Sequence, residues 1–134
     1  MKRTYLGLAF GALVAVGALL SLPSCGHDQQ LMSITIIPTG ETITGTGVIV
    51  PFMAQGNYIH PPEIRDITNS VVWASTAPQI ISIIAATGVA TTGDGCGTNI
   101  TITATAYANP QNHSGRAVVG TAPVSVAQPG GTCP

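Results

Sequence analysis

The clearest pattern in the chain is the alternation of apolar and polar side chains over residues 99–107 (NITITATAY). A period of two is typical of a β-strand with one buried face and one wet face. Residues 109–115 (NPQNHSG) have the composition of a turn, and residues 117–127 (AVVGTAPVSVA) return as a strand. Pro123 indicates that the returning strand lies at an edge or carries a bulge. The two strands predict a hairpin.

Shorter strand signals precede this hairpin, separated by Pro and Gly residues that favour turns. They cover residues 32–37, 48–58, 64–68, 70–75, 80–85 and 88–91, and a proline-stiffened loop (HPPE) is expected at 60–63. About seven short strands, with turns at regular spacing and a Trp near the middle, predict an all-β domain and a two-sheet sandwich in particular. We predict that its core includes Phe52, Trp73, Ile100 and Ile102.

The first 24 residues have the layout of an export signal. Met1-Lys2-Arg3 is a positive start, and residues 5–20 form an uncharged apolar stretch, slightly shorter than the ~20 residues that span a bilayer as a helix. The following Ser21-Leu22-Pro23-Ser24-Cys25 resembles a lipobox, which implies cleavage before Cys25 and acylation of its thiol, for example with palmitate. An uncleaved anchor helix and a cleaved signal without lipid are the alternatives.

This interpretation divides the chain into four parts. They are a signal peptide (1–24) expected to form a cleaved helix, a lipidated Cys with a short tether (25–31), the β-domain (32–127) and a tail (128–134). Buried acyl chains contribute about 0.8 kcal/mol per CH₂, so lipid on Cys25 would hold the protein on a membrane. Gly26 favours the outer membrane if the source has two membranes. We therefore expect a lipid-anchored protein of the cell envelope.

Three cysteines in an exported chain leave one without a disulfide partner. Lipidation of Cys25 would explain the odd thiol and leave Cys96 and Cys133 to form a disulfide. The predicted hairpin brings the positions before its first strand and after its second strand to the same end, which makes the bridge geometrically reasonable. In the chain-entropy model a loop of this size adds roughly 4 kcal/mol of stability. Two free thiols are the alternative.

The charge of the exported part argues against nucleic acid as a partner. From Cys25 onward the only Lys or Arg residues are Arg65 and Arg116, against five carboxylates. Affinity for a phosphate backbone comes mainly from clustered cations, and no such cluster exists in this sequence.

Residues 32–127 contain several motifs in the order in which they occur along the group 2 bacterial immunoglobulin-like (BIG2) domain, and they therefore resemble that domain. They are Ile34-Thr35-Ile36-Ile37-Pro38; Phe52, Ala54, Gly56 and Tyr58 in one strand; Arg65-Asp66-Ile67-Thr68; Val71-Val72-Trp73-Ala74-Ser75; Gly88-Val89-Ala90-Thr91; and Gly97-Thr98-Asn99-Ile100-Thr101-Ile102-Thr103-Ala104. The 60–63 loop and the two non-lipidated cysteines depart from the family pattern. The resemblance implies an immunoglobulin-like β-sandwich that serves as a binding module or a spacer and carries no catalytic residues.

Candidate chemistry is sparse. His27, His60 and His113 lack the short spacing of metal ligands, and Asp94 between two glycines is more typical of a turn than of a Ca²⁺ site. We therefore expect no metal or cofactor. Tyr58, His60 and Tyr107 are candidates for an exposed patch that contacts a sugar or a protein, although core packing or simple exposure is the default interpretation of each.

These observations predict a non-enzymatic envelope lipoprotein that displays one immunoglobulin-like module for adhesion, or for binding a protein or polysaccharide. A purely structural envelope component without a specific ligand is the alternative. An enzyme or a metal-binding protein is the third possibility, and no motif in the sequence favours it.

Overall fold

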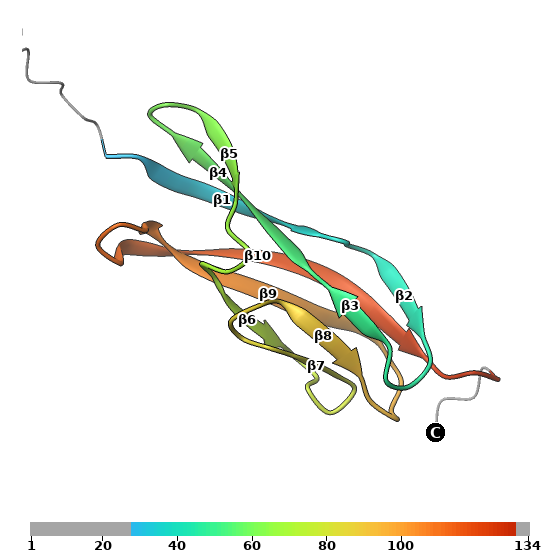
Figure 1. Cartoon of the computed structure of the whole chain (residues 1–134). Coiled ribbons are helices and arrows are strands. Elements are labelled where there is room, and N and C mark those ends of the chain that lie inside the picture. The colour runs from blue at the N-terminus through green and yellow to red at the C-terminus, as the bar shows by residue number, and fades with distance from the viewer. Residues whose placement is uncertain (1–27, 131–134) are drawn as a thin grey trace, which may run out of the picture.

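The computed structural model describes residues 28–130, and this part of the chain is built of ten β-strands without a helix (Figure 1). In chain order the strands are β1 (Gln30–Ile37), β2 (Glu41–Thr44), β3 (Ile49–Pro51), β4 (Met53–Ile59), β5 (Glu63–Asp66), β6 (Val72–Ser75), β7 (Ile81–Ile83), β8 (Val89–Thr92), β9 (Gly97–Asn109) and β10 (Ser114–Ala127). The predicted all-β class is therefore confirmed. The predicted signal peptide and Cys25 lie outside the described residues.

The strands form three sheets, in the orders β2-β10-β9-β6, β1-β4-β5 and β3-β8-β7. The predicted hairpin is confirmed as β9 and β10, the two longest strands, which pair antiparallel. All other pairs are antiparallel too, except that β2 runs parallel to the end of β10. Pro123, expected at an edge or a bulge, sits in an interior strand, where it pairs with Thr101 just before the β2 contact begins and next to a shift in register.

The strand expected over residues 48–58 is two strands. Phe52 separates β3 from β4, and its backbone N–H donates a 2.9 Å hydrogen bond to the carbonyl oxygen of Gly88 instead of to a strand neighbour. As a result β3 pairs with β8, whereas β4 pairs with β1 and β5. This division, together with the short β2, gives ten strands in the described part where about seven were expected.

The core lies between β1 and β4 on one side and β10, β9 and β6 on the other (Figure 1). Alternate residues of the long strands point into it, as the burial pattern along β9 and β10 shows. Phe52, Trp73, Ile100 and Ile102 are 1%, 2%, 4% and 0% exposed. Burial of one such side chain contributes roughly 1.5–3 kcal/mol, so these residues are a large part of what holds the sheets together.

Two glycines allow close approach inside this core. A Cβ on Gly88 would lie 2.7 Å from Cε2 of Trp73, and Gly88 has a φ of +72° that L side chains rarely adopt. A Cβ on Gly120 in β10 would lie 2.7 Å from the carbonyl oxygen of Ile34 in β1. The small residue at each position lets a buried ring or a neighbouring strand pack directly against the backbone.

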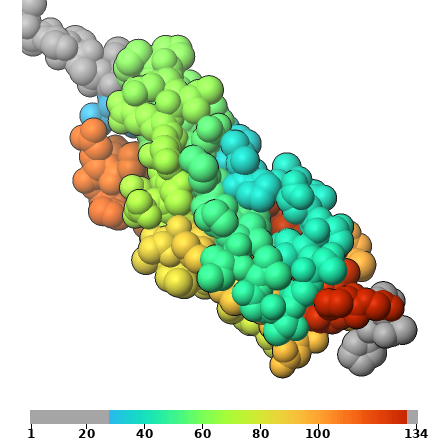
Figure 2. All heavy atoms as spheres, turned by 45° about the vertical axis from the view of Figure 1, so that its right-hand side comes forward, coloured from blue at the N-terminus to red at the C-terminus, as the bar shows by residue number. Residues whose placement is uncertain are grey.

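The described part is elongated, and the chain enters at one end and leaves at the other (Figures 1 and 2). The β9–β10 turn lies at the end where β1 begins, as does the β4–β5 turn, because Gln30 pairs with Ile59. We call this end the entry end. The turn before β9 lies at the opposite end, beside the end of β10, where Val126 pairs with Gly97.

Candidate functional site

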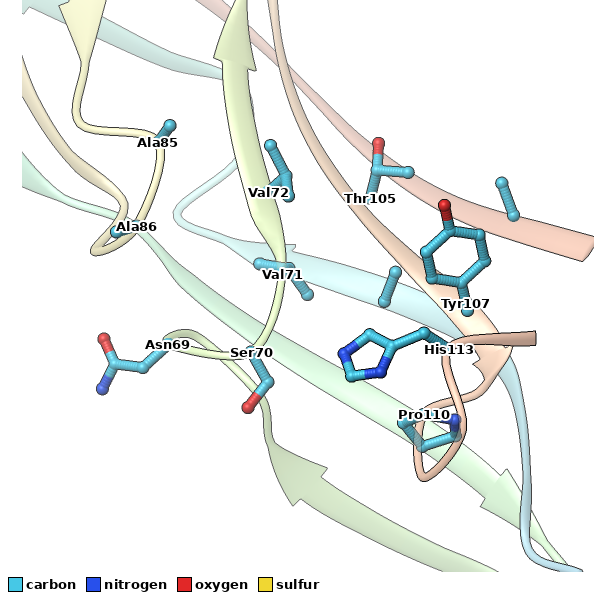
Figure 3. A pocket seen from close by; sticks show the side chains of 12 residues that line it. Asn69, Ser70, Val71, Val72, Ala85, Ala86, Thr105, Tyr107, Pro110 and His113 are labelled. Atoms are coloured by element: carbon cyan, nitrogen blue, oxygen red, sulfur yellow. The ribbon is translucent and has the colours of Figure 1, made fainter.

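A groove of about 760 Å³ lies where three segments of the chain meet, one of them the β9–β10 turn at the entry end (Figure 3). The segments are the approach to β6, the turn between β7 and β8, and the β9–β10 hairpin. No charged side chain lines the groove, whose lining residues are Asn69, Ser70, Val71, Val72, Ala85, Ala86, Thr105, Ala106, Tyr107, Pro110, His113 and Ala117. The groove is therefore electrically neutral and mostly apolar.

Main-chain hydrogen bonds hold the three segments together. Val72 in β6 lies opposite Thr105 in β9, which joins the first segment to the hairpin. The backbone N–H of Trp73 donates a 3.0 Å bond to the carbonyl oxygen of Ala85, which brings the β7–β8 turn alongside β6. The indole Nε1 of Trp73 donates a 2.9 Å bond to the carbonyl oxygen of Thr68 and so fixes the approach to β6. The buried Trp73 thus supports two walls of the groove.

The third wall carries two rings. The centroids of Tyr107 and His113 are 6.3 Å apart with the rings at 76°, an edge-to-face arrangement. His113 has a φ of 52° in the β9–β10 turn, and Figure 3 shows its imidazole directed into the groove. The side-chain oxygen of Asn112 accepts bonds from the N–H and the hydroxyl of Ser114, which stabilises the turn that presents His113.

The polar side chains of the groove have unused hydrogen-bonding capacity. The amide of Asn69 and the hydroxyls of Ser70, Thr105 and Tyr107 make no hydrogen bond to another residue of 28–130. An amide and three hydroxyls can both donate and accept. The groove therefore combines apolar walls with neutral groups that are available to a polar ligand.

The structure does not assemble the patch proposed from Tyr58, His60 and Tyr107. Tyr58 is buried, only 7% exposed, so its interpretation as an exposed contact residue is wrong. It shares the inward parity of β4, and burial is the main reason that its pKa is raised. His60 is exposed in the β4–β5 turn and does not line the groove. Tyr107 alone of the three lines it, and it is 48% exposed.

A separate charged cluster marks β5. The Arg65 guanidinium lies 2.6 Å from a carboxylate oxygen of Glu63, and its Cζ stands 5.3 Å from the centre of the Tyr58 ring. The hydrogen bond from Arg65, and then one from Gln29, lower the pKa of Glu63. Because Glu63 and Arg65 are exposed and both lie in β5, this pair adds little to stability. The bond from Gln29 to Glu63 joins β5 to the segment before β1.

Asp66 stabilises the turn after β5. Its carboxylate accepts a 2.6 Å bond from the hydroxyl of Thr68 and a 2.9 Å bond from the N–H of the same residue. These bonds, the hydroxyl first, hold the pKa of Asp66 below its ordinary value. The carbonyl oxygen of Thr68 in turn accepts the Trp73 indole N–H. By binding Thr68, Asp66 therefore stabilises the segment that leads into the groove.

The predicted bridge joins a described residue to one that is not described. Cys96 is partly buried in the turn before β9, and Cys133 lies outside the described residues. Gln128 donates side-chain bonds of 3.3 and 3.0 Å to the carbonyl oxygens of Gly93 and Gly95. This contact holds the start of the tail beside the turn that carries Cys96, and the bridge stays a prediction.

No family model matches this chain, and no curated protein matches it. Within residues 28–130, no three of the His, Cys, Asp and Glu side chains come together in a way that could hold a metal ion. In the same part of the chain there is also no helix that is both long and apolar enough to cross a membrane.

Sequence reasoning found one ring of the groove and missed most of its lining. Ser70 was expected to begin a strand and Ala85 to end one, and no local pattern drew attention to Asn69 or Ala86. His113 was assigned to a solvent-exposed turn, and its exposure is correct. The only local signal for the groove is the exposed ring of Tyr107 on the polar side of the strand alternation, because the other walls come from distant segments.

Proposed function

We propose that this chain is a bacterial cell-envelope lipoprotein, anchored by lipid on Cys25, that displays one BIG2-like immunoglobulin domain. The domain is a non-enzymatic binding module whose contact site is the groove. The observation that carries this function is a neutral groove with unpartnered polar groups, walled on one side by the β9–β10 turn at the entry end of the domain.

The topology supports the immunoglobulin-like part of the proposal. Immunoglobulin domains pack one sheet of strands A, B, E and D on a sheet of C, F and G, with a buried Trp on C. If β1 is A, β3 and β4 together are B, β6 is C, β7 is D, β8 is E, and β9 and β10 are F and G, the observed neighbours follow this order. Trp73 then lies on strand C, and it is 2% exposed.

The lipid anchor is supported by the leader and by the cysteine count, and it has its own test. Cys25→Ser should abolish labelling by a radioactive or clickable fatty acid and release the protein from the membrane fraction. Cys96→Ser is the matched control, since it removes a thiol without touching the lipobox. Labelling that persists in Cys25→Ser would show that the lipid is attached elsewhere, and a wild type that takes up no label would show that there is no lipid.

The binding function is tested with the full-length protein purified in detergent. Saturable binding to an extract of the cell envelope is expected, and Ala86→Asp, which puts a carboxylate into the neutral groove, should abolish it. Ile49→Asp is the control, because Ile49 is 67% exposed on β3, outside the groove. Binding that is absent, or equal in the two variants, would favour the alternative of a structural envelope component without a specific ligand.

A further inference from the structure

We propose that the ligand of the groove is an uncharged saccharide of the cell's own envelope. This inference rests on the proposed binding function and names the chemical class that the groove is built to take. Four features of the groove support it: the lack of charged side chains, the ring of Tyr107, the free polar groups and the position of the groove in the domain.

The charge of the groove excludes the strongly charged classes of ligand. No Lys, Arg, Asp or Glu lines it. A phosphate or carboxylate ligand would lose its hydration on entry without gaining an ion pair, and a cation would do the same. Of the two arginines after Cys25, Arg65 is already bound to Glu63, and Arg116 is not a lining residue. A neutral ligand meets no such penalty.

The free polar groups exclude a purely apolar occupant. An acyl chain or an apolar side chain would strip water from the amide of Asn69 and from the hydroxyls of Ser70 and Thr105 without replacing those hydrogen bonds. Each of these groups both donates and accepts, as the hydroxyls of a sugar do. A ligand with many hydroxyl groups therefore satisfies the groove where an apolar ligand does not.

The ring of Tyr107 provides an apolar contact surface for the same saccharide. Its half-exposed face carries partial negative charge, which attracts the C–H groups on the flat face of a sugar ring. His113 meets this ring edge-on and holds it in one orientation. Ala117 is paired with Tyr107, and Ala85 and Ala86 lie across the groove from the rings (Figure 3), so small side chains leave space on both sides. The volume of about 760 Å³ lies within the range of about 300–1,000 Å³ typical of small-molecule sites.

The position of the groove points to a saccharide close to the membrane. Five peptide units separate Cys25 from Gln30, and a fully extended chain of that length spans at most about 18 Å. The β9–β10 turn, which forms one wall of the groove, lies at the end of the domain at which β1 begins. Lipid on Cys25 therefore holds the groove near the membrane surface, within reach of the glycans of the same cell.

The test uses full-length protein in detergent and the polysaccharides of the same envelope, separated by anion exchange into neutral and anionic fractions. Calorimetric titration should show saturable binding of the neutral fraction only. Tyr107→Ala should weaken it at least tenfold, whereas Tyr107→Phe, which keeps the ring, should stay within about threefold of the wild type. His113→Asn also removes a ring but tolerates positive φ, and it should weaken binding.

Val119→Ala is the matched control. Val119 is 53% exposed on the same face of the sheet, pairs with Thr105 and does not line the groove, so its truncation should leave affinity unchanged. Equal thermal melting of the variants shows that a loss of binding is not a loss of fold. Binding of the anionic fraction, binding of neither fraction, or unchanged affinity in Tyr107→Ala would each overturn the saccharide assignment.

The two proposals fail in different ways. If neither polysaccharide fraction binds but an envelope component is bound and Ala86→Asp removes that binding, the saccharide class is wrong and the binding function stands. If Ala86→Asp and Tyr107→Ala both leave all envelope binding intact, the groove is not the contact site and both proposals fall.

Discussion

Gly88→Ala is expected to destabilise the domain by about 2–4 kcal/mol. A left-handed backbone costs a non-glycine residue roughly 1–2 kcal/mol, and Gly88 has a φ of +72°. The added Cβ would lie 2.7 Å from Cε2 of Trp73 and 2.9 Å from the carbonyl oxygen of Phe52. Overpacking of this kind adds about 1–3 kcal/mol, and the lower entropy of the unfolded chain returns about 0.4–1 kcal/mol.

Two other glycines separate these contributions. Gly40 has nearly the same φ, +73°, but a Cβ there would meet nothing within 4 Å, so Gly40→Ala should cost only the backbone term, about 1 kcal/mol. Gly120 is not among the positive-φ residues, yet its Cβ would lie 2.7 Å from the carbonyl oxygen of Ile34. Gly120→Ala should therefore cost only the packing term, about 1–3 kcal/mol.

Urea denaturation of a chain beginning at residue 26 measures these losses. The single Trp of the chain, Trp73, is buried, and its fluorescence should shift to the red on unfolding. The midpoint should fall most for Gly88→Ala, with an unchanged slope. If Gly88→Ala and Gly40→Ala lost the same stability, the close contact between Gly88 and the Trp73 ring would be refuted.

Two further predictions concern single groups. Because Thr68 lowers the pKa of Asp66 in the folded state, the stabilisation is present above the ordinary aspartate value of 3.8 and is lost as the pH falls through the lower folded value. Asp66→Asn should therefore reduce the loss of unfolding free energy as the pH falls through this range. A dependence of stability on pH identical to that of the wild type would contradict the reasoning. The Cys96–Cys133 bridge predicts that the intact mature protein is about 2 Da lighter than its reduced form. Mass spectrometry before and after reduction measures the difference, and equal masses would indicate two free thiols.

Several features of the fold could be predicted because they depend on neighbouring residues. The alternation over residues 99–107 predicted β9 and its wet face, since side chains in a strand point to opposite faces in turn. The turn composition of residues 109–115 predicted the hairpin with β10. Apolar side chains at alternate positions similarly identified the all-β class.

Other features depend on partners that are distant in the sequence. Phe52 shares the parity of Ala54, Gly56 and Tyr58, so the alternation does not mark it as the point where the chain leaves one sheet for another. β2 is four residues long and pairs with β10 about eighty residues away. For Tyr58 the sequence left core packing and an exposed contact open, and the packed structure buries it.

The sequence by itself determined the all-β class and the inward face of the two longest strands, β9 and β10, because these follow from composition and from a period of two. Only the tertiary structure decided which strands are neighbours, and with them the groove. Its walls come from the approach to β6, the β7–β8 turn and the β9–β10 hairpin. Such a site forms only when sheet pairing and the packing of Trp73 bring those segments together. No local pattern in the sequence therefore predicts it.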